Sequence, residues 1–300
     1  SSTSRKGYVG ISYTMVKRAA IHDACNLDVV DLKFASAEGA GEDATGYTVE
    51  LWAGPNASDL ETGGSGTVEL YQANIDLRLP IGNGLDLKVG QFTTVVGADS
   101  SNRNENAFYT HSRAFDTDQP THHTGVLASY QLTDDASISV GFVNDTTSNS
   151  TNADSGGTAY LVSLSYTLPD SLGFLGGTEL TYARVDGAGE DDDEQDNDYV
   201  GLSIPTPVEG LSYNFAWDVV DYELGKDSSI LGHYLSYAAT DVLTINLRYE
   251  TGSTHAGAIA TGHTHEVQDL AVGVAYPFWA DGVSRVDSVR QDDDRQDTSD

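Results

Sequence analysis

The fold class is decided by one stretch of the sequence, Tyr71-Gln72-Ala73-Asn74-Ile75-Asp76-Leu77-Arg78-Leu79, then Pro80 to Gly84, then Leu85-Asp86-Leu87-Lys88-Val89. Apolar and polar side chains alternate on both sides of a short turn, which predicts a β-hairpin with one apolar and one polar face. The same alternation recurs in fifteen segments between Gly7 and Arg290. Short and long connections alternate between these segments. This combination is typical of an all-β, transmembrane, antiparallel up-and-down β-barrel, with lipid outside and water inside.

The composition fits a single barrel domain over residues 1–300. The chain has 31 glycines and 16 tyrosines but one methionine, and 39% of its residues are hydrophobic, which is ordinary for a barrel with a wet interior. No apolar run approaches the roughly 18 residues of a membrane helix. Cys25 alone excludes an internal disulfide. No signal peptide stands at Ser1, so we expect an exported protein to be present here in its processed form.

The charge of the chain is strongly negative. A formal net charge of −31 excludes nucleic acid as a natural partner. The acids gather in expected loops, above all in residues 190–198. This run is either a solvated loop or a site for Ca²⁺ or Mg²⁺ that bridges to anionic lipid head groups, although it lacks the pattern of a calcium-binding loop.

The connections predict the orientation of the barrel. The short ones carry Pro, Asn, Asp and Gly and are residues 80–84, 133–135, 168–177, 205–210, 239–241 and 277–282. Strict alternation places them all at one end, which is the periplasmic end of outer-membrane barrels. The longest connection, residues 95–124, is at the other end.

One face of the segments is apolar and uncharged, and we expect it to meet lipid. Tyr130, Tyr166 and Tyr276 stand near short turns, whereas Tyr182, Trp217 and Tyr249 stand near the other strand ends. They predict two aromatic girdles at the membrane interfaces. The segment Ile230–Ala238 fits poorly, because either phase exposes His233 or Ser236 to lipid.

The opposite face carries charges that would be costly in a dry core, so we expect it to line a wet pore. Each base on this face has an acid two residues away, which predicts ion pairs along the strands. The acids outnumber the bases, which predicts a negative lumen. The wall residues are Asp31, Lys33, Glu50, Asp76, Arg78, Asp86, Lys88, Glu179, Asp218, Arg248, Glu250, Asp269, Arg285 and Asp287.

Several motifs resemble a known family. They are Val89-Gly90-Gln91-Phe92, Ser112-Arg113-Ala114-Phe115, Pro120-Thr121-His122-His123-Thr124-Gly125-Val126, the first strand Gly7-Tyr8-Val9-Gly10-Ile11-Ser12-Tyr13, and Val283-Ser284-Arg285-Val286-Asp287. Together they resemble the OmpL-like β-barrel porin family. Asp99 and Ala98 depart from the family, which often has Glu and an aromatic residue there.

The resemblance implies a bacterial outer-membrane porin for passive diffusion of small hydrophilic solutes. With a negative lumen we expect it to favour cations. Loop 95–124 is the candidate constriction, where facing acids and bases would select solutes by charge and size. Its charged residues are Asp99, Arg103, Glu105, Arg113, Asp116 and Asp118. By analogy with porins, the expected partners are membrane lipid, lipopolysaccharide and further copies of the chain in a trimer.

Two other classes of protein stay open. A soluble, acidic β-rich surface or binding protein would turn its apolar stripes inward. A barrel enzyme of the outer membrane would need a catalytic serine or acid beside a base at the rim. The sequence shows no nucleophile elbow, phosphate-binding loop or dinucleotide fingerprint, so we expect no enzyme.

Histidines provide weak metal candidates. His263 and His265 would share a face of an extended segment, and His122 and His123 stand at the start of another expected strand. Imidazoles at such spacings bind zinc or copper only with a further fixed ligand, so we expect rim residues instead and no cofactor.

The C-terminal end leaves the strand number open. The fifteenth segment is followed by the acidic residues 291–300, whereas bacterial barrels have even strand numbers. We expect about sixteen strands, with the last one absent from this chain. A miscount by one and a closed barrel of fourteen are the alternatives.

Overall fold

The computed structural model describes residues 7–16, 26–36, 45–54, 57, 68–103, 105–117, 119–144, 158–188, 195–222, 227–254, 265–279, 282–292 and 295–296. Strands dominate the described residues. They are β1 (Gly7–Val16), β2 (Asn26–Ser36), β3 (Thr45–Ala53), β4 (Val68–Leu79), β5 (Leu85–Thr93), β6 (His122–Thr133), β7 (Ala136–Asn144), β8 (Thr158–Thr167), β9 (Glu179–Ala188), β10 (Gln195–Pro205), β11 (Leu211–Tyr222), β12 (Ser228–Thr240), β13 (Leu243–Thr254), β14 (His265–Trp279), β15 (Gly282–Asp292) and β16 (Arg295–Gln296). The helices are α1 (Arg113–Thr117) and the 3₁₀ helix η1 (Asp170–Leu175). No described helix is long and apolar enough to cross a membrane.

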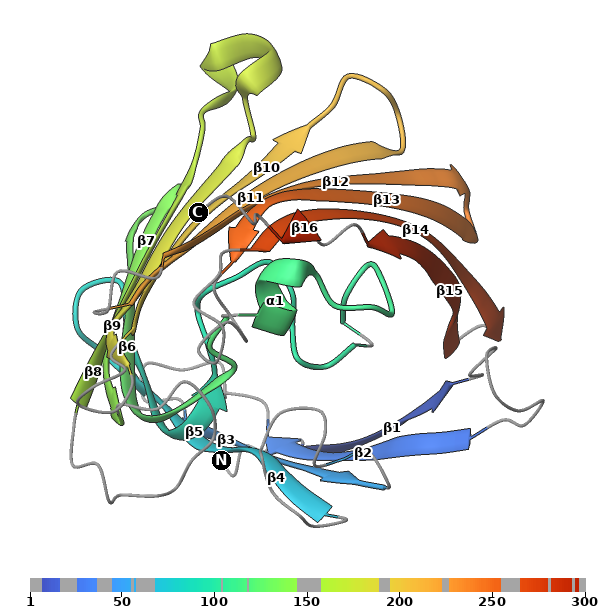
Figure 1. Cartoon of the computed structure of the whole chain (residues 1–300). Coiled ribbons are helices and arrows are strands. Elements are labelled where there is room, and N and C mark those ends of the chain that lie inside the picture. Colours follow the sequence, from blue (N-terminus) through green and yellow to red (C-terminus); the bar gives the residue numbers. More distant parts are fainter. Residues whose placement is uncertain are drawn as a thin grey trace.

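All strands belong to one antiparallel sheet that curls around a central space (Figure 1). From β1 to β15 each strand pairs with the next one in the sequence. This up-and-down order confirms the expected fold class, and the hairpin of β4 and β5 is as expected. The short β16 pairs with β14, so it is not a closing strand. Among the described residues no pairing joins β1 to β15, and a sixteenth, closing strand stays a prediction.

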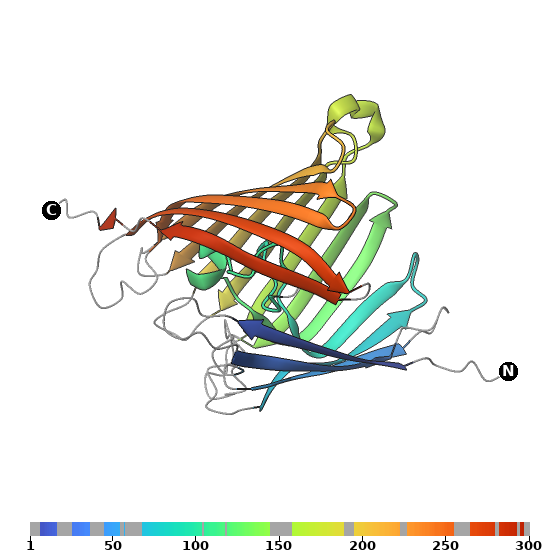
Figure 2. The ribbon, with the colours of Figure 1, turned by 90° about the vertical axis from the view of Figure 1, so that its right-hand side faces the viewer.

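The connections sort by end only in part: β5–β6 (residues 94–121) and β7–β8 (145–157) are long as expected, but β9–β10 (189–194) and β11–β12 (223–227) are shorter than β8–β9 (168–178) at the other end. The start of β1 and the end of β15 lie at opposite ends of the barrel (Figure 2), as fifteen consecutive antiparallel strands require. Short turns follow β4, β6, β10 and β12. In the first of them Gly82 and Gly84 have φ angles of 58° and 99°, which side chains other than glycine rarely adopt. The Tyr130 hydroxyl accepts a hydrogen bond from the Asn83 amide at 3.1 Å and so ties this turn to β6.

The two faces of the sheet are those of a membrane barrel. Large apolar side chains stand exposed on the outside, among them Ile75, Val126, Val140, Leu247 and Val272. Charged and amide side chains are buried on the inside, among them Glu50, Asn74, Asn246, Arg248, Glu250 and Asp269. A soluble β protein would show the reverse, so the soluble alternative is wrong.

The poorly fitting strand β12 turns His233 outward, in phase with the exposed Leu235 and Tyr237. The Tyr213 hydroxyl lies 2.7 Å from His233 Nδ1 and gives the imidazole a hydrogen-bonding partner on the outer face. The inward phase of β12 instead buries Ile230 and Tyr234. Burial of these larger side chains decides the phase.

The outer face also carries one charged cluster, which the sequence analysis missed. Arg184 of β9 is in phase with the outward-facing Leu180 and pairs with Asp186, Asp196 and Asp198 at 3.3, 2.6 and 2.5 Å. The cluster lies toward the end of β9 and the start of β10, next to the connection between these strands. Charges near the ends of the strands of a membrane barrel cost less than charges at the midplane of the bilayer.

Candidate functional site

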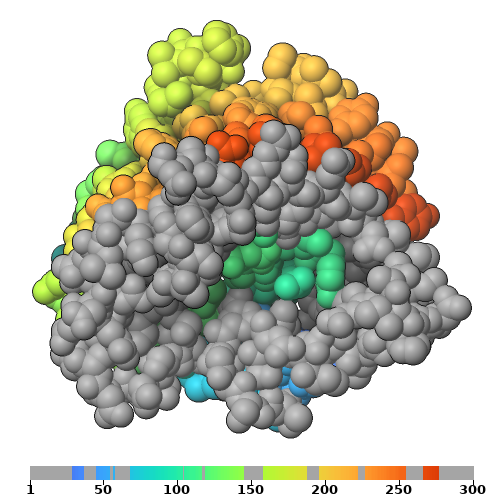
Figure 3. Space-filling model, viewed as in Figure 1, coloured from blue at the N-terminus to red at the C-terminus, as the bar shows by residue number. Residues whose placement is uncertain are grey.

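The connection between β5 and β6 lies inside the barrel. Helix α1, near the C-terminal end of this connection, stands within the ring of strands (Figure 1), and the same segment shows at the centre of this face of the molecule (Figure 3). Its two ends are joined: the Thr94 amide donates to the Thr121 carbonyl at 3.0 Å, and Thr94 Oγ1 lies 2.9 Å from His123 Nε2. We call residues 94–121 the inner loop.

The first residues of the inner loop pack on an apolar patch of the inner wall. Val96 joins a buried cluster with Phe92, Leu127, Leu161 and Val185. The sequence predicted that the inner face lines a wet pore, and this apolar part of it is a correction. Burial of these side chains against one another holds the loop to strands β6, β8 and β9, because apolar surface removed from water stabilises the contact.

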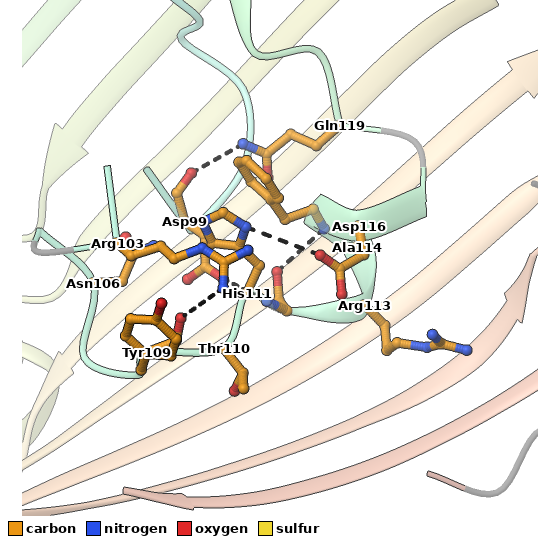
Figure 4. Close-up of polar contacts among 12 residues, drawn as sticks. Asp99, Arg103, Asn106, Tyr109, Thr110, His111, Arg113, Ala114, Asp116 and Gln119 are labelled. Carbon is orange, nitrogen blue, oxygen red and sulfur yellow. Dashed lines mark hydrogen bonds and ion pairs between the residues drawn. The ribbon is translucent and has the colours of Figure 1, made fainter. Parts of the chain in front are cut away.

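The middle of the inner loop is held by its own hydrogen bonds (Figure 4). Asp99 Oδ2 accepts a hydrogen bond from the Ser112 amide at 2.6 Å. The side chain of Asn106 accepts a hydrogen bond from the Ser100 amide at 2.8 Å and donates one to the Ser100 carbonyl at 2.6 Å. Gln119 Nε2 donates to the Asp99 carbonyl at 3.0 Å. These contacts join both limbs of the loop, so it has a defined shape.

Strand β13 provides the firmest anchor of the inner loop. The Arg248 guanidinium donates to the carbonyls of Thr110 and His111 at 2.9 and 2.7 Å. Glu250 accepts from the Arg113 amide with both carboxylate oxygens, at 3.0 and 2.9 Å. The side chains of Arg248 and Glu250 are fully buried. Such charge-assisted hydrogen bonds are stronger than neutral ones.

The buried anchor holds more acid than base. Arg248 lies 3.0 Å from Glu250, 3.2 Å from Asp269 and 3.9 Å from Asp99. Burial raises the pKa of Asp99 above its usual 3.8, although the charge of Arg248 opposes this shift. Burial, aided by the charge of Arg103, lowers the pKa of His111 to about 3. His111 is therefore neutral at ordinary pH.

The inner loop also reaches the opposite wall. Asn102 Nδ2 lies 3.5 Å from Asp31 Oδ2 of β2, whereas Arg113 and Ala107 contact β13 through Glu250 and Asn246. In Figure 1, β2 and β13 lie on opposite sides of the ring. The loop therefore crosses the interior from wall to wall.

The six charged residues expected in the constriction have different surroundings. Asp99 is buried beside Arg248, and Arg103 lies 5.3 Å from the ring of Tyr109. Glu105 is exposed and accepts from the Ser100 hydroxyl at 2.8 Å. Asp116 is exposed, 3.9 Å from His111, and Arg113 contributes its amide to the anchor. Asp118 lies outside the described residues.

The wall charges pair between strands. Lys33 lies 3.0 Å from Glu50, Arg78 2.9 Å from Asp86, and Lys88 2.7 Å from Asp76. These partners stand directly opposite each other in the register. For Arg78 and Lys88 the expectation of pairs along one strand was wrong, because residues opposite each other are closer than residues two apart.

Other wall residues differ in exposure. The expected wet wall is correct at the Arg78–Asp86 pair, whose side chains are 36% and 40% exposed. It is wrong at Arg248, Glu250 and Asp269, which the inner loop covers. Asp218 borders a small cavity beside Val96 and Ala114. The side chains of Arg285 and Asp287 lie outside the described residues.

The metal candidates gain no support from the described residues, where no group of histidine, cysteine or acid side chains is arranged to hold an ion. His263 and the side chain of His265 lie outside that part of the chain. His122 and His123 are buried at the root of the inner loop. In the acidic run 190–198, residues 190–194 are not described, and Asp196 and Asp198 bind Arg184.

A family comparison decides what this barrel is. The family described as "Putative beta-barrel porin-2, OmpL-like" matches residues 12–300. The chain belongs to this family. It is a bacterial outer-membrane porin, and its family and fold indicate a channel rather than an enzyme. No curated protein matches the chain.

Solved structures share the fold of this porin at low sequence identity. OmpF of Salmonella typhi, in complex with daunomycin, matches with a TM-score of 0.65 and 12% identity over 95% of this chain and 88% of that one. The trimer form of the outer membrane protein OmpT of Vibrio cholerae matches with a TM-score of 0.61 and 12% identity over 96% of each chain. The anion-selective porin of Comamonas acidovorans matches with a TM-score of 0.54 and 12% identity over 92% and 86%.

Sequence reasoning missed several residues of the porin interior. Tyr199 and Tyr234 face inward beside the inner loop; from the sequence, the strand of Tyr199 has no assigned face and the phase of the strand of Tyr234 is not settled. Asn246 was missed as well, although its phase with Arg248 and Glu250 is a signal that could have identified it. Its amide donates to the Ala107 carbonyl at 2.9 Å.

Proposed function

We propose that this porin passes small hydrophilic solutes by passive diffusion and favours cations. The observation that carries the cation preference is the pairing of the wall bases. Lys33, Arg78 and Lys88 each lie against an acid of the neighbouring strand. Paired bases attract few anions, so the remaining acids dominate the potential of the lumen.

Further acids border the cavities of the interior. Glu105 and Glu179 border a cavity next to the inner loop, and Asp218 borders another. Arg248, the base of the anchor, is fully buried and lies beside three acids. Because a narrow polar space concentrates the field of its walls, we expect K⁺ to enter more readily than Cl⁻.

The inner loop is the proposed constriction. It crosses the interior between β2 and β13, so a solute must pass beside it. The anchor at Arg248 and Glu250 holds it in place, and the exposed Glu105 and Asp116 give it negative charge. The chemistry required is selection by size and charge alone.

The test is conductance in a planar lipid bilayer. Detergent-purified full chain is added under a KCl gradient, and single steps and the reversal potential are recorded. Stepwise openings with a reversal potential toward that of K⁺ support the proposal. Openings that prefer Cl⁻ would leave a channel but overturn its cation preference, and folded protein without steps would overturn the open channel.

We further propose that the porin assembles as a trimer and contacts membrane lipid and lipopolysaccharide. The trimer form of the Vibrio cholerae protein OmpT and the exposed apolar outer face support this assembly. Cross-linking in outer-membrane vesicles, followed by gel electrophoresis, tests it. A trimer band with bound lipopolysaccharide is expected, and a monomer band at every cross-linker concentration would contradict it.

A further inference from the structure

A cavity of about 320 Å³ lies between the inner loop and the inner face of strands β9 to β12. We propose that it binds organic ammonium ions as they pass through the channel, an inference that rests on the proposed channel function. Sites for small molecules have volumes of about 300–1,000 Å³, so this cavity admits one small organic ion. The loop borders it through Asp99, Glu105 and Phe108, and the wall through Tyr199 and Tyr234.

Small residues make room for the cavity. Gly201 of β10 stands opposite Ala216 of β11, and Ala216 stands opposite Gly232 of β12. These three residues form one row across the wall, and all three are buried. Gly201 and Ala216 also border the cavity. A side chain at either glycine would meet a tyrosine ring of the wall and displace it toward the loop.

Two tyrosine rings lie along the wall over these glycines. A Cβ atom on Gly201 would stand 2.5 Å from the hydroxyl oxygen of Tyr199, and one on Gly232 would stand 2.7 Å from Cε2 of Tyr234. The rings therefore cover the glycines instead of projecting across the interior. Tyr234 is buried, whereas Tyr199 is half-buried, so Tyr199 offers the accessible aromatic surface.

The charge of the lining points to a cation. Glu105 and Glu179 border the cavity and are exposed, and no lysine or arginine borders it among the described residues. Asp99 also borders it, but this carboxylate is buried and accepts from the Ser112 amide. An anion would meet acids without a compensating base, so the lining disfavours it.

The aromatic surface separates organic from inorganic cations. The face of a tyrosine ring attracts ammonium groups, and the attraction grows when water is displaced. A quaternary ammonium ion gives up its weak hydration shell readily and presents methyl groups to the ring, whereas K⁺ has none. Thr181, Ser203 and Asn214 also border the cavity and offer oxygen acceptors to an N–H group.

Binding is measured first, without a membrane. Full-length protein folded in detergent is titrated with tetramethylammonium chloride by calorimetry, with NaCl as the salt control. We expect saturable binding that weakens about tenfold in Tyr199→Leu but changes less than about twofold in Tyr199→Phe, which keeps the aromatic face. Equal affinity in Tyr199→Leu and the natural protein, or no binding at all, would overturn the proposal.

A second variant keeps the test decisive. If Tyr199→Leu does not fold, as judged by heat-modifiable gel mobility, Glu179→Gln replaces it, because Glu179 is exposed at the start of its strand. Weaker binding of tetramethylammonium by Glu179→Gln supports the proposal. Unchanged binding by Glu179→Gln would overturn the claim that the acidic lining attracts the cation.

The bilayer then separates this inference from the channel function. Tetramethylammonium should reduce the K⁺ current of the natural protein but not that of Tyr199→Leu, and glucose should leave both currents unchanged. A reduction that persists in Tyr199→Leu would overturn the assigned site. If no channel opens while the calorimetric difference between the variants remains, the channel function fails and the ammonium site stands.

Discussion

Glu250 of β13 accepts a bifurcated hydrogen bond, through both carboxylate oxygens, from the backbone amide of Arg113, which is 137 residues away in the sequence. Neighbouring Arg248 donates to the carbonyls of Thr110 and His111. One wall strand thus supplies both an acceptor and a donor to the backbone of the inner loop. Because backbone groups of the loop make these bonds, they fix the path of its main chain against β13.

Replacing Glu250 tests the anchor. Glu250→Ala leaves Arg248 with one fewer buried partner and the Arg113 amide without its acceptor, and breaking a buried pair costs about 3–5 kcal/mol. Urea unfolding in detergent should show this loss, and the channel current should become noisy as the loop moves. The control is Asp86→Ala, which breaks a half-exposed pair and should cost under about 1 kcal/mol. Equal losses in both variants would contradict the anchor.

Gly97 is required by the backbone of the inner loop. Its φ is 95°, and a Cβ atom there would collide with the Gln119 side chain. Gly97→Ala should therefore strain the loop by about 1–3 kcal/mol. Gly173 also has a positive φ, 66°, but a Cβ atom added there would have no atom within 4 Å. Gly173→Ala therefore serves as the control. Conductance should change in Gly97→Ala alone, and unaltered conductance there would count against the loop geometry.

The cross-strand pair of Lys88 and Asp76 should set part of the ion selectivity. Lys88→Gln leaves Asp76 unpaired in the lumen and should move the reversal potential further toward that of K⁺. Asp76→Asn should move it the other way, because it leaves the base unpaired. Both side chains are partly exposed, so the effect on stability should stay below about 1 kcal/mol. Shifts of the same sign in both variants would refute the assignment.

His111 should make stability depend on pH. Its pKa is lowered from 6.5 to about 3 in the folded protein, so the unfolded chain binds more protons between these values. Stability is then lost as pH falls below 6.5, with a slope of up to about 1.4 kcal/mol per pH unit. The raised pKa of Asp99 acts with the opposite sign, because above pH 3.8 the folded protein keeps the proton longer.

Unfolding by urea at several pH values measures this dependence. His111→Asn should flatten the decline of stability below pH 6.5, because asparagine does not titrate. Asp99→Asn should instead make that decline steeper, since it removes the opposing contribution. A pH profile of His111→Asn that parallels the natural protein would show that the histidine is not held neutral.

Much of the fold can be read from the sequence, because strand alternation is local. The alternation of Ile75, Asp76, Leu77 and Arg78 fixes which side chains share a face, and the structure exposes Ile75 outside and pairs Arg78 inside. The alternation did not decide which face of β12 points outward, because either phase would expose a polar residue, His233 or Ser236, to lipid. There the burial of Ile230 and Tyr234 against other strands decided the phase.

The candidate site was harder to predict because its contacts are long-range. The length of residues 95–124 and the charge of Asp99 indicated a segment of interest, but not that Asp99 would lie beside Arg248. The apolar patch around Leu127 and Leu161 is invisible as a binding surface until Val96 packs on it. Likewise, no local pattern shows that Tyr199 lies over Gly201.

The sequence by itself determined the strands, the apolar outer face and the charged side chains of the inner face, because each depends on residue type and a period of two. The tertiary structure alone decided the strand register, which pairs Lys88 with Asp76 instead of Asp86. It also decided which charges are covered. Glu250 and Asp86 are both acids on the inner face, yet the first is buried by the inner loop and the second remains exposed. The physical reason is that burial depends on which distant segments fill the space, and the order of residues along one strand carries no information about that.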